Sequence, residues 1–179
     1  LRGKFELSLL DKLKQDYLNL GKDTYKFTIK TIYSPETTVK KEEAATLEVL
    51  YNIISSDPAL SGEFALNVSQ TCAALGRQLG FDSEQRQQLR QAGLLSELGK
   101  LGLPAALQTT PFYQLTPQER SHYLQHPQYA EEILAPALHL HAVSDAIGQQ
   151  YEKFNGSGEP LHRVGTDICM NARILAVAR

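Results

Sequence analysis

Histidines and carboxylates are the side chains that most often hold catalytic metal ions, and this chain has 5 histidines and 20 Asp and Glu residues. His122 and His126 are four residues apart, which puts two imidazoles on one face of a helix, and Glu119 precedes them. His139 and His141 are two apart, so on a helix they point in different directions. Because no third ligand other than Glu119 is evident nearby, we interpret His122 and His126 as a surface histidine beside a buried, vestigial one.

Glycines mark two further places where chemistry could occur. Lys100 follows Gly99 and could contact a phosphate, although stabilisation of a helix C-terminus is the interpretation we favour. Gly156-Ser157-Gly158-Glu159-Pro160 is either a turn between helices or a partner-binding loop. No glycine-rich phosphate loop follows a strand, and no serine stands in a nucleophile elbow.

Composition and charge exclude several classes of protein. The 179 residues carry a net charge of −2, and Lys40-Lys41 is cancelled at once by Glu42-Glu43, so we expect no nucleic-acid polymer as partner. No apolar run reaches the roughly 20 residues that span a bilayer, and Leu1–Glu6 is no secretory signal, so we expect no membrane contact and a cytoplasmic location. Cys72 and Cys169 are predicted to be free thiols.

The elements that must position these side chains are predominantly helical. Leucine spacing predicts an amphipathic helix over residues 6–20, and alternation at 25–29 predicts a short strand. Further helices are expected at 39–55, 61–79, 82–95, 116–126, 128–134, 136–153 and from about 165 onward. The predicted fold is a mostly α helical bundle, residues 39–179 and cut short at its C-terminus, behind an N-terminal helix/strand extension or linker, residues 1–38, from a lost upstream domain.

Four segments, in order, carry a resemblance to a known family. They are Leu89–Pro104, Leu115–Pro127, Gln149–Pro160 and Ala172–Ala178. Together they resemble the bacterial HD-GYP branch of the HD phosphohydrolase superfamily: its His-Asp-x-Gly-Lys motif, its segment like Leu-Thr-Pro-Gln-Glu-Arg with His-Pro behind it, its His-His-Glu followed by a glycine loop, and its last aspartate-bearing helix. The resemblance implies the HD-domain bundle, and for active members it implies cyclic di-GMP phosphodiesterase activity with two or three metal ions.

At the positions that this resemblance assigns to metal ligands, most ligands are replaced. An earlier histidine falls on Glu63 or Phe64, and the register stays open. The vestigial catalytic positions are Ser96, Glu97, His126, Gln150, Tyr151 and Arg179. Only His126, with Glu97 as a carboxylate substitute, remains as a candidate metal ligand, and the Arg179 guanidinium would repel a cation. Two ligands cannot hold a binuclear centre, so we expect no catalysis and no cofactor.

The resulting prediction is a catalytically inactive HD-GYP-like output domain in bacterial signal transduction, of the kind fused to response regulators. The candidate residues for binding a ligand or partner are Lys100, Glu152, Gly156, Gly158, Glu159 and Pro160. The expected partners are another signalling protein, such as a diguanylate cyclase-type domain, cyclic di-GMP, and a second copy of the chain paired through residues 6–20.

Three alternatives remain open. The first is a divergent metal-dependent phosphohydrolase of the cyclic di-GMP phosphodiesterase type, built from Glu97, His126 and Glu152. The second is a sensor that binds a nucleotide through Lys100 and Arg179 without hydrolysing it. The third is a related HD output domain without the glycine loop, which the sequence Gly-Ser-Gly-Glu-Pro disfavours.

Overall fold

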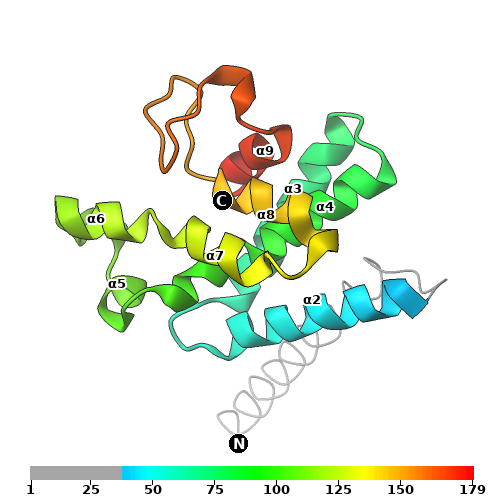
Figure 1. Cartoon of the computed structure of the whole chain (residues 1–179), viewed down its shortest axis with the longest axis horizontal. Helices are drawn as coiled ribbons and strands as arrows, with labels where there is room; N and C mark the ends of the chain where they lie inside the picture. The colour runs from blue at the N-terminus through cyan, green and yellow to red at the C-terminus, as the bar shows by residue number, and fades with distance from the viewer. Residues whose placement is uncertain (1–37) are drawn as a thin grey trace, which may run out of the picture. The chain divides into compact units, whose positions relative to one another are not determined.

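The computed structural model describes residues 38–179, with side chains from residue 42 onward. The chain divides into two compact units, Leu1–Ala44 and Ala45–Arg179, and the second contains nearly all of the described residues. Its elements are α2 Thr38–Ser56, α3 Gly62–Gln78, α4 Ser83–Leu95, η1 Leu98–Gly102, α5 Ala105–Thr109, η2 Phe112–Gln114, α6 Pro117–Tyr123, α7 His126–Leu134, η3 Leu138–Leu140, α8 His141–Gly148, η4 Gly165–Asp167 and α9 Met170–Ala178, where η marks a 3-10 helix. The predicted mostly helical fold is confirmed (Figure 1).

Helix starts follow the side-chain caps that the sequence predicts. Ser61 caps α3, and Asp82 caps α4 in a capping box closed by Gln85. Thr116 caps α6 with Glu119 in the same reciprocal arrangement. Each cap satisfies backbone N–H groups that the first helical turn leaves without a partner. The capping side chains therefore determine where these three helices begin.

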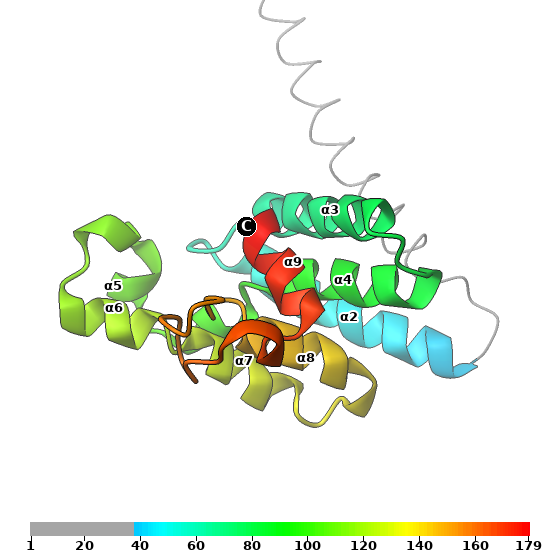
Figure 2. The same cartoon turned by 90° about the horizontal axis from the view of Figure 1, so that it is seen from above.

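Helix α4 lies at the centre of the described bundle and packs against α3, α8 and α9. Its approach to α3 is close because Gly93 faces the backbone of Ser69, which a Cβ atom at Gly93 would meet at 2.7 Å. The Ser69 hydroxyl also donates to the Arg90 carbonyl at 2.8 Å. Figure 2 shows α9 running over the bundle so that its end lies near α3, in agreement with the contacts between these two helices. This arrangement carries the end of α9 toward the end of α4.

A second close crossing places η1 against the start of α7. A Cβ atom at Gly99 would collide with the His126 carbonyl oxygen, so only glycine permits this approach. Glu97 precedes this crossing on one segment, and His126 begins the other. The crossing therefore determines how close the two candidate metal ligands can come.

The segment from α5 to α6 projects at one end of the bundle (Figures 1 and 2). Leu103, Leu107 and Leu115 form its buried cluster, and Tyr123 and Tyr129 pack against that cluster. This small core holds η2 and α6 in place. The rings of Phe112 and Tyr123 are thereby fixed beside each other.

The structure differs from the sequence-based expectation between residues 136 and 153. A single long helix is predicted there, but the chain forms η3 and then α8, which ends at Gly148. The Gln149 amide oxygen accepts a hydrogen bond from the Cys169 N–H at 2.9 Å, which ties this turn to the start of α9. Apolar spacing did not show that the helix ends at Gly148.

Two further expectations concern strands and membrane contact. Residues 38–179 contain no strand, only an isolated antiparallel bridge between Asn155 and Val164. The predicted helix at 6–20 and strand at 25–29 lie outside the described residues. In the part of the chain that the structure describes, no helix is both long and apolar enough to cross a bilayer.

Replacing Gly99 with alanine should strongly destabilise the domain, because the new methyl group must push α7 away from η1. We expect a loss of about 3 kcal/mol in the free energy of unfolding, measured by urea denaturation. Gly80→Ala is the matched control: Gly80 has φ +76° but open space around it, so only about 1 kcal/mol of backbone strain is expected. Equal losses in the two variants would contradict the close crossing.

Candidate functional site

A buried carboxylate, Glu97, lies at the centre of the candidate site, between the end of α4 and the start of η1. Its Oε1 accepts a hydrogen bond from Arg179 Nη2 at 2.6 Å, and its Oε2 is ion-paired with Lys100 Nζ. All three side chains are largely withdrawn from solvent, with 6%, 12% and 14% of the Glu97, Arg179 and Lys100 side chains exposed. Two cations thus hold one carboxylate.

Arg179 reaches this site from the end of α9 and makes further contacts there. Its Nη1 donates to the Ser96 carbonyl at 3.1 Å, and its Nη2 also donates to the Tyr151 hydroxyl oxygen at 3.3 Å. Its guanidinium carbon lies 5.6 Å from the Tyr151 ring centroid and 6.0 Å from that of Phe64. Phe64, one of the two positions left open for the early histidine, therefore lies beside the site.

The charges at the site do not cancel. Burial by itself would raise the pKa of the Glu97 carboxyl, but the positive charges of Arg179 and Lys100 outweigh it, and the pKa lies below its usual value. Burial raises the pKa of the Tyr151 hydroxyl to about 12, so this group stays protonated at neutral pH. Two cations against one carboxylate leave one positive charge in excess.

His126 is fully buried, with 0% of its surface exposed. Its Nδ1 lies 2.9 Å from the Tyr123 carbonyl oxygen, and because a carbonyl can only accept, Nδ1 carries the proton and donates. Its Nε2 has no hydrogen-bond partner among the residues that the structure describes. Burial lowers the pKa of His126 to about 4, so the imidazole is neutral at pH 7 and presents a free electron pair.

Ser96 and Gln150 belong to the site through hydrogen bonds and not as metal ligands. The Ser96 hydroxyl donates to the Gly93 carbonyl at 3.0 Å, inside its own helix end. The Gln150 Nε2 donates to the Ser96 carbonyl at 3.3 Å, and within the described part of the chain its Oε1 has no hydrogen-bond partner. The Ser96 carbonyl therefore accepts from both Gln150 and Arg179.

Glu152 supports the glycine loop from inside the protein. Its two carboxylate oxygens accept hydrogen bonds from the backbone N–H groups of Leu161, at 2.7 Å, and Arg163, at 2.9 Å. Gly158 packs so closely on the backbone of Glu152 and Lys153 that a Cβ atom there would collide with it. Glu152 thus holds the loop, and Gly158, Glu159 and Pro160 belong to the segment that it fastens.

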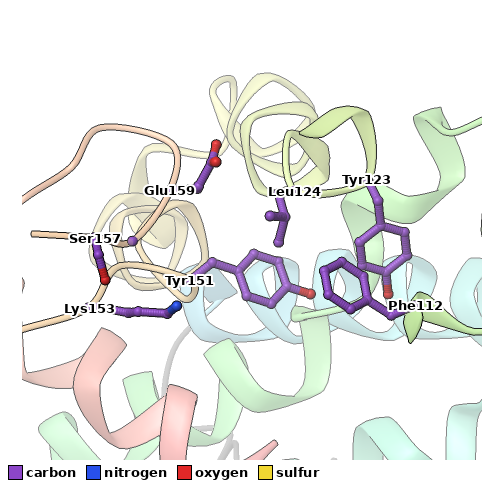
Figure 3. A pocket seen from close by; sticks show the side chains of 8 residues that line it. Phe112, Tyr123, Leu124, Tyr151, Lys153, Ser157 and Glu159 are labelled. Carbon is purple, nitrogen blue, oxygen red and sulfur yellow. The ribbon is translucent and has the colours of Figure 1, made fainter. Parts of the chain in front are cut away.

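A pocket of about 430 Å³ opens beside this loop. Its lining residues are Phe112, Tyr123, Leu124, Tyr151, Lys153, Ser157, Gly158 and Glu159. In Figure 3 the hydroxyl of Tyr151 points toward Phe112 and Tyr123, and Lys153, Ser157 and Glu159 are drawn on the other side of the Tyr151 ring. Tyr151 belongs both to this pocket and to the ionic site.

The structure gathers the six positions that the resemblance assigns to the catalytic site. Ser96, Glu97, Gln150, Tyr151 and Arg179 are joined by hydrogen bonds. The sixth, His126, contacts the Tyr151 ring edge-on, with 5.4 Å between ring centroids. Lys100 joins them through Glu97.

Other candidate residues lie elsewhere. His122 Nε2 lies 3.4 Å from the Tyr129 hydroxyl, and His141 pairs with Asp145 at 3.3 Å, so neither belongs to the site. Sequence reasoning missed Tyr123, whose carbonyl orients His126. A signal was present, because Tyr123 precedes His126 by three residues, the spacing of neighbours on a helix.

Comparisons with known proteins agree with this architecture. A model of the HD domain family matches residues 48–179. The chain is 28% identical over 142 residues to the cyclic di-GMP phosphodiesterase response regulator RpfG of Xanthomonas campestris, covering 78% of this chain and 37% of the relative. It is 27% identical over 136 residues to the 3'3'-cGAMP-specific phosphodiesterase 2 of Vibrio cholerae, covering 73% of this chain and 26% of the relative.

A solved structure shares the fold. Bd1817, described as an HDG"Y"P protein from Bdellovibrio bacteriovorus, superposes with a TM-score of 0.59 over 91% of this chain and 67% of that protein, at 20% identity. This likeness confirms the predicted HD-domain bundle. The chain spans less than two fifths of the length of the curated relatives it matches.

These findings correct one prediction. The sequence led us to expect no cofactor, and that expectation is wrong: the family match and the phosphodiesterase relatives imply metal-dependent chemistry. In the described region, however, no group of three or more His, Cys, Asp and Glu side chains could hold a metal ion. The donors present are Glu97, already paired with two cations, and His126 Nε2. This donor set does not fit a centre of two or three metal ions.

Removing the charge of Glu97 should cost more stability than removing that of Arg179. Glu97→Gln leaves two buried cations without a counter-charge, for an expected loss of about 3 kcal/mol in the free energy of unfolding. Arg179→Met leaves a neutral Glu97–Lys100 pair and should cost less. Urea unfolding at pH 7 measures both, with the exposed Glu132→Gln as control. A smaller loss for Glu97→Gln than for Arg179→Met would contradict the two-cation arrangement.

His126 should make the protein less stable in mild acid. Its pKa in the folded protein is about 4, below the roughly 6.5 of an unfolded chain, so the unfolded state binds more protons between these values. Between pH 7 and pH 5 this group should remove about 2 kcal/mol of stability. His126→Asn keeps a donor for the Tyr123 carbonyl but should lack this loss. The exposed His139→Asn should behave as the wild type, and an unchanged pH dependence in His126→Asn would disprove the effect.

Proposed function

The chain belongs to the HD domain family, in its HD-GYP-type branch, and from that premise we propose that this domain works in bacterial signalling by recognising a cyclic dinucleotide or a partner protein without hydrolysing a phosphodiester. Such a domain keeps the family's bundle and pocket but uses them for binding.

One observation carries this proposal. Arg179 stands where the resemblance gives the family its last metal-binding aspartate, and its guanidinium is hydrogen-bonded to Glu97. Arginine stays protonated at all ordinary pH values, so it keeps a positive charge at the place where catalysis would need a cation bound by carboxylates. The protein's own cations neutralise Glu97. An incoming metal ion would have to displace Arg179 and Lys100 together.

The charge balance supports a phosphate-bearing ligand. The cluster of Glu97, Lys100 and Arg179 retains one positive charge, and Lys153 lines the adjoining pocket. Phosphate groups carry negative charge that such a site would neutralise. The relatives RpfG and the Vibrio cholerae phosphodiesterase 2 are named for cyclic dinucleotides, which bear two such groups. The glycine loop at Gly156–Pro160 offers the surface for a partner protein.

A second candidate function is metal-dependent phosphodiester hydrolysis, as in those relatives. The unpaired Nε2 of buried His126 favours it, because this electron pair faces no protein donor and could bind a metal ion. Glu97 would be the second ligand. Water, substrate and Glu152 would have to complete the coordination, although the Glu152 carboxylate holds the loop backbone.

The experiment that separates the two functions measures binding and hydrolysis on the same preparation. We expect titration calorimetry to detect cyclic di-GMP or 3'3'-cGAMP, while chromatography after incubation with Mn²⁺ or Fe²⁺ finds the dinucleotide intact. The Xanthomonas campestris relative, treated identically, is the positive control. Linear product formed at a rate that depends on the metal, and lost in His126→Asn, would overturn the proposal in favour of the second function.

A further inference from the structure

We infer that the hairpin of α3 and α4 carries an anion-binding site, formed by Arg77, Arg86 and Arg90, for a ligand with a compact and multiply charged phosphate group. The three arginines take no part in the ion pairs around Glu97 and do not line the pocket beside the glycine loop. A ligand bound there would therefore be recognised apart from the function proposed above.

Two packed helices bring the three arginines together. Arg86 and Arg90 are four residues apart on α4, which advances the helix by about 6 Å and makes them neighbours on one face. Arg77 lies in the last turn of α3, which runs beside α4 (Figure 2). The helices approach closely at this point, because a Cβ atom at Gly76, the residue before Arg77, would lie 3.4 Å from Arg86 Cγ. The arginines of both helices therefore gather near the turn that joins them.

The positive charges of these arginines are not paired. None of the three forms an ion pair in the part of the chain that the structure describes, although Asp82 and Glu84 are close to Arg86 in sequence. The Asp82 carboxylate accepts a backbone N–H in the capping box of α4 instead. Burial, followed by the positive charges of Arg77 and Arg86, lowers the pKa of the Arg90 guanidinium below its usual value. Arginine remains protonated at neutral pH, so three like charges stay together.

The fold holds these charges close to one another in spite of their repulsion. Arg86 and Arg90 are partly buried, and the Arg90 carbonyl accepts a hydrogen bond from the Ser69 hydroxyl at 2.8 Å, which fixes its backbone against α3. Like charges four residues apart on a helix are destabilising, and an anion that neutralises them removes this cost. A partly buried side chain also has less freedom to lose when a ligand binds. The arrangement therefore favours capture of an anion.

The number of charges favours a phosphate group over carboxylates. A guanidinium offers parallel N–H donors that match the oxygens of either group. A phosphate monoester carries about −1.5 to −2 at neutral pH on three oxygens, and linked phosphates carry more, whereas each carboxylate of an acidic peptide carries a single charge. Three neighbouring guanidinium groups therefore suit a compact phosphate group, which a soluble phosphate compound or the headgroup of an anionic lipid can supply.

The test uses titration calorimetry of the full chain with sodium tripolyphosphate at constant ionic strength. We expect binding that weakens when sodium chloride is added, because salt screens the attraction between exposed charges. Arg86→Gln and Arg90→Gln should each weaken this binding by about tenfold or more, since each removes a charge-assisted hydrogen-bond donor. Tripolyphosphate should raise the melting temperature of the wild type, and that of the two variants much less.

Two further variants locate the bound phosphate. Arg120→Gln removes an exposed arginine on α6, so it makes the same change in net charge outside the hairpin and should bind tripolyphosphate as the wild type does. Lys153→Gln removes the cation that lines the pocket. Binding that is lost in Lys153→Gln but kept in Arg86→Gln and Arg90→Gln would place the phosphate in the pocket and overturn the inference. Circular dichroism checks that every variant is folded.

A second assay distinguishes the two sources of phosphate. Sedimentation with phosphatidylcholine vesicles that contain phosphatidic acid, lost in Arg86→Gln and Arg90→Gln, would support the site with a lipid headgroup as its ligand. Tripolyphosphate binding without sedimentation would support it with a soluble ligand. No binding in either assay, binding unchanged in both α4 variants, or tighter binding of polyglutamate than of tripolyphosphate would each overturn the inference. None of these outcomes decides whether a cyclic dinucleotide binds in the pocket, which these arginines do not line.

Discussion

The buried carboxylate of Glu97 needs compensation, and the way it receives that compensation organises the rest of the site. A carboxylate withdrawn from water is strongly unfavourable unless opposite charge and hydrogen bonds replace its hydration. Here Arg179 and Lys100 provide both. Because Arg179 comes from the end of α9 while Glu97 follows α4, the ion pair also joins the last helix to the middle of the bundle.

Burial of the site explains why His126 and Tyr151 are uncharged, and the same two cations add to the effect on His126. With two cations nearby, a protonated His126 would be both buried and repelled, and its imidazole is accordingly held neutral through Nδ1. Tyr151 remains a phenol for a related reason, because burial disfavours its charged form. The family's scaffold thus contains a polar cluster in which the protein's own side chains supply the positive charge. The adjoining pocket is lined by three aromatic rings, one of which, Tyr151, also belongs to the polar cluster.

Sequence reasoning succeeded where the cause was local. The capping boxes at Asp82 and Thr116 depend on residues three positions apart, so the helix starts could be predicted. The family motifs likewise predicted that Ser96, Glu97 and Gln150 would lie together. The end of α8 at Gly148 could not be predicted from apolar spacing, which does not show where a helix stops. The partners of Arg179 could not be predicted either. Its charge alone predicted that it would repel a metal ion, but did not indicate which carboxylate its guanidinium would contact.

Arg179 also ties the site to the folding of the whole bundle. Its hydrogen bonds reach back 83 residues to Ser96, 82 to Glu97 and 28 to Tyr151. Closing loops of that length costs chain entropy that no local segment recovers by itself, so these bonds form only when the intervening helices are already packed. The assembled cluster therefore reports on cooperative folding: unfolding that separates α9 from the end of α4 would break these hydrogen bonds.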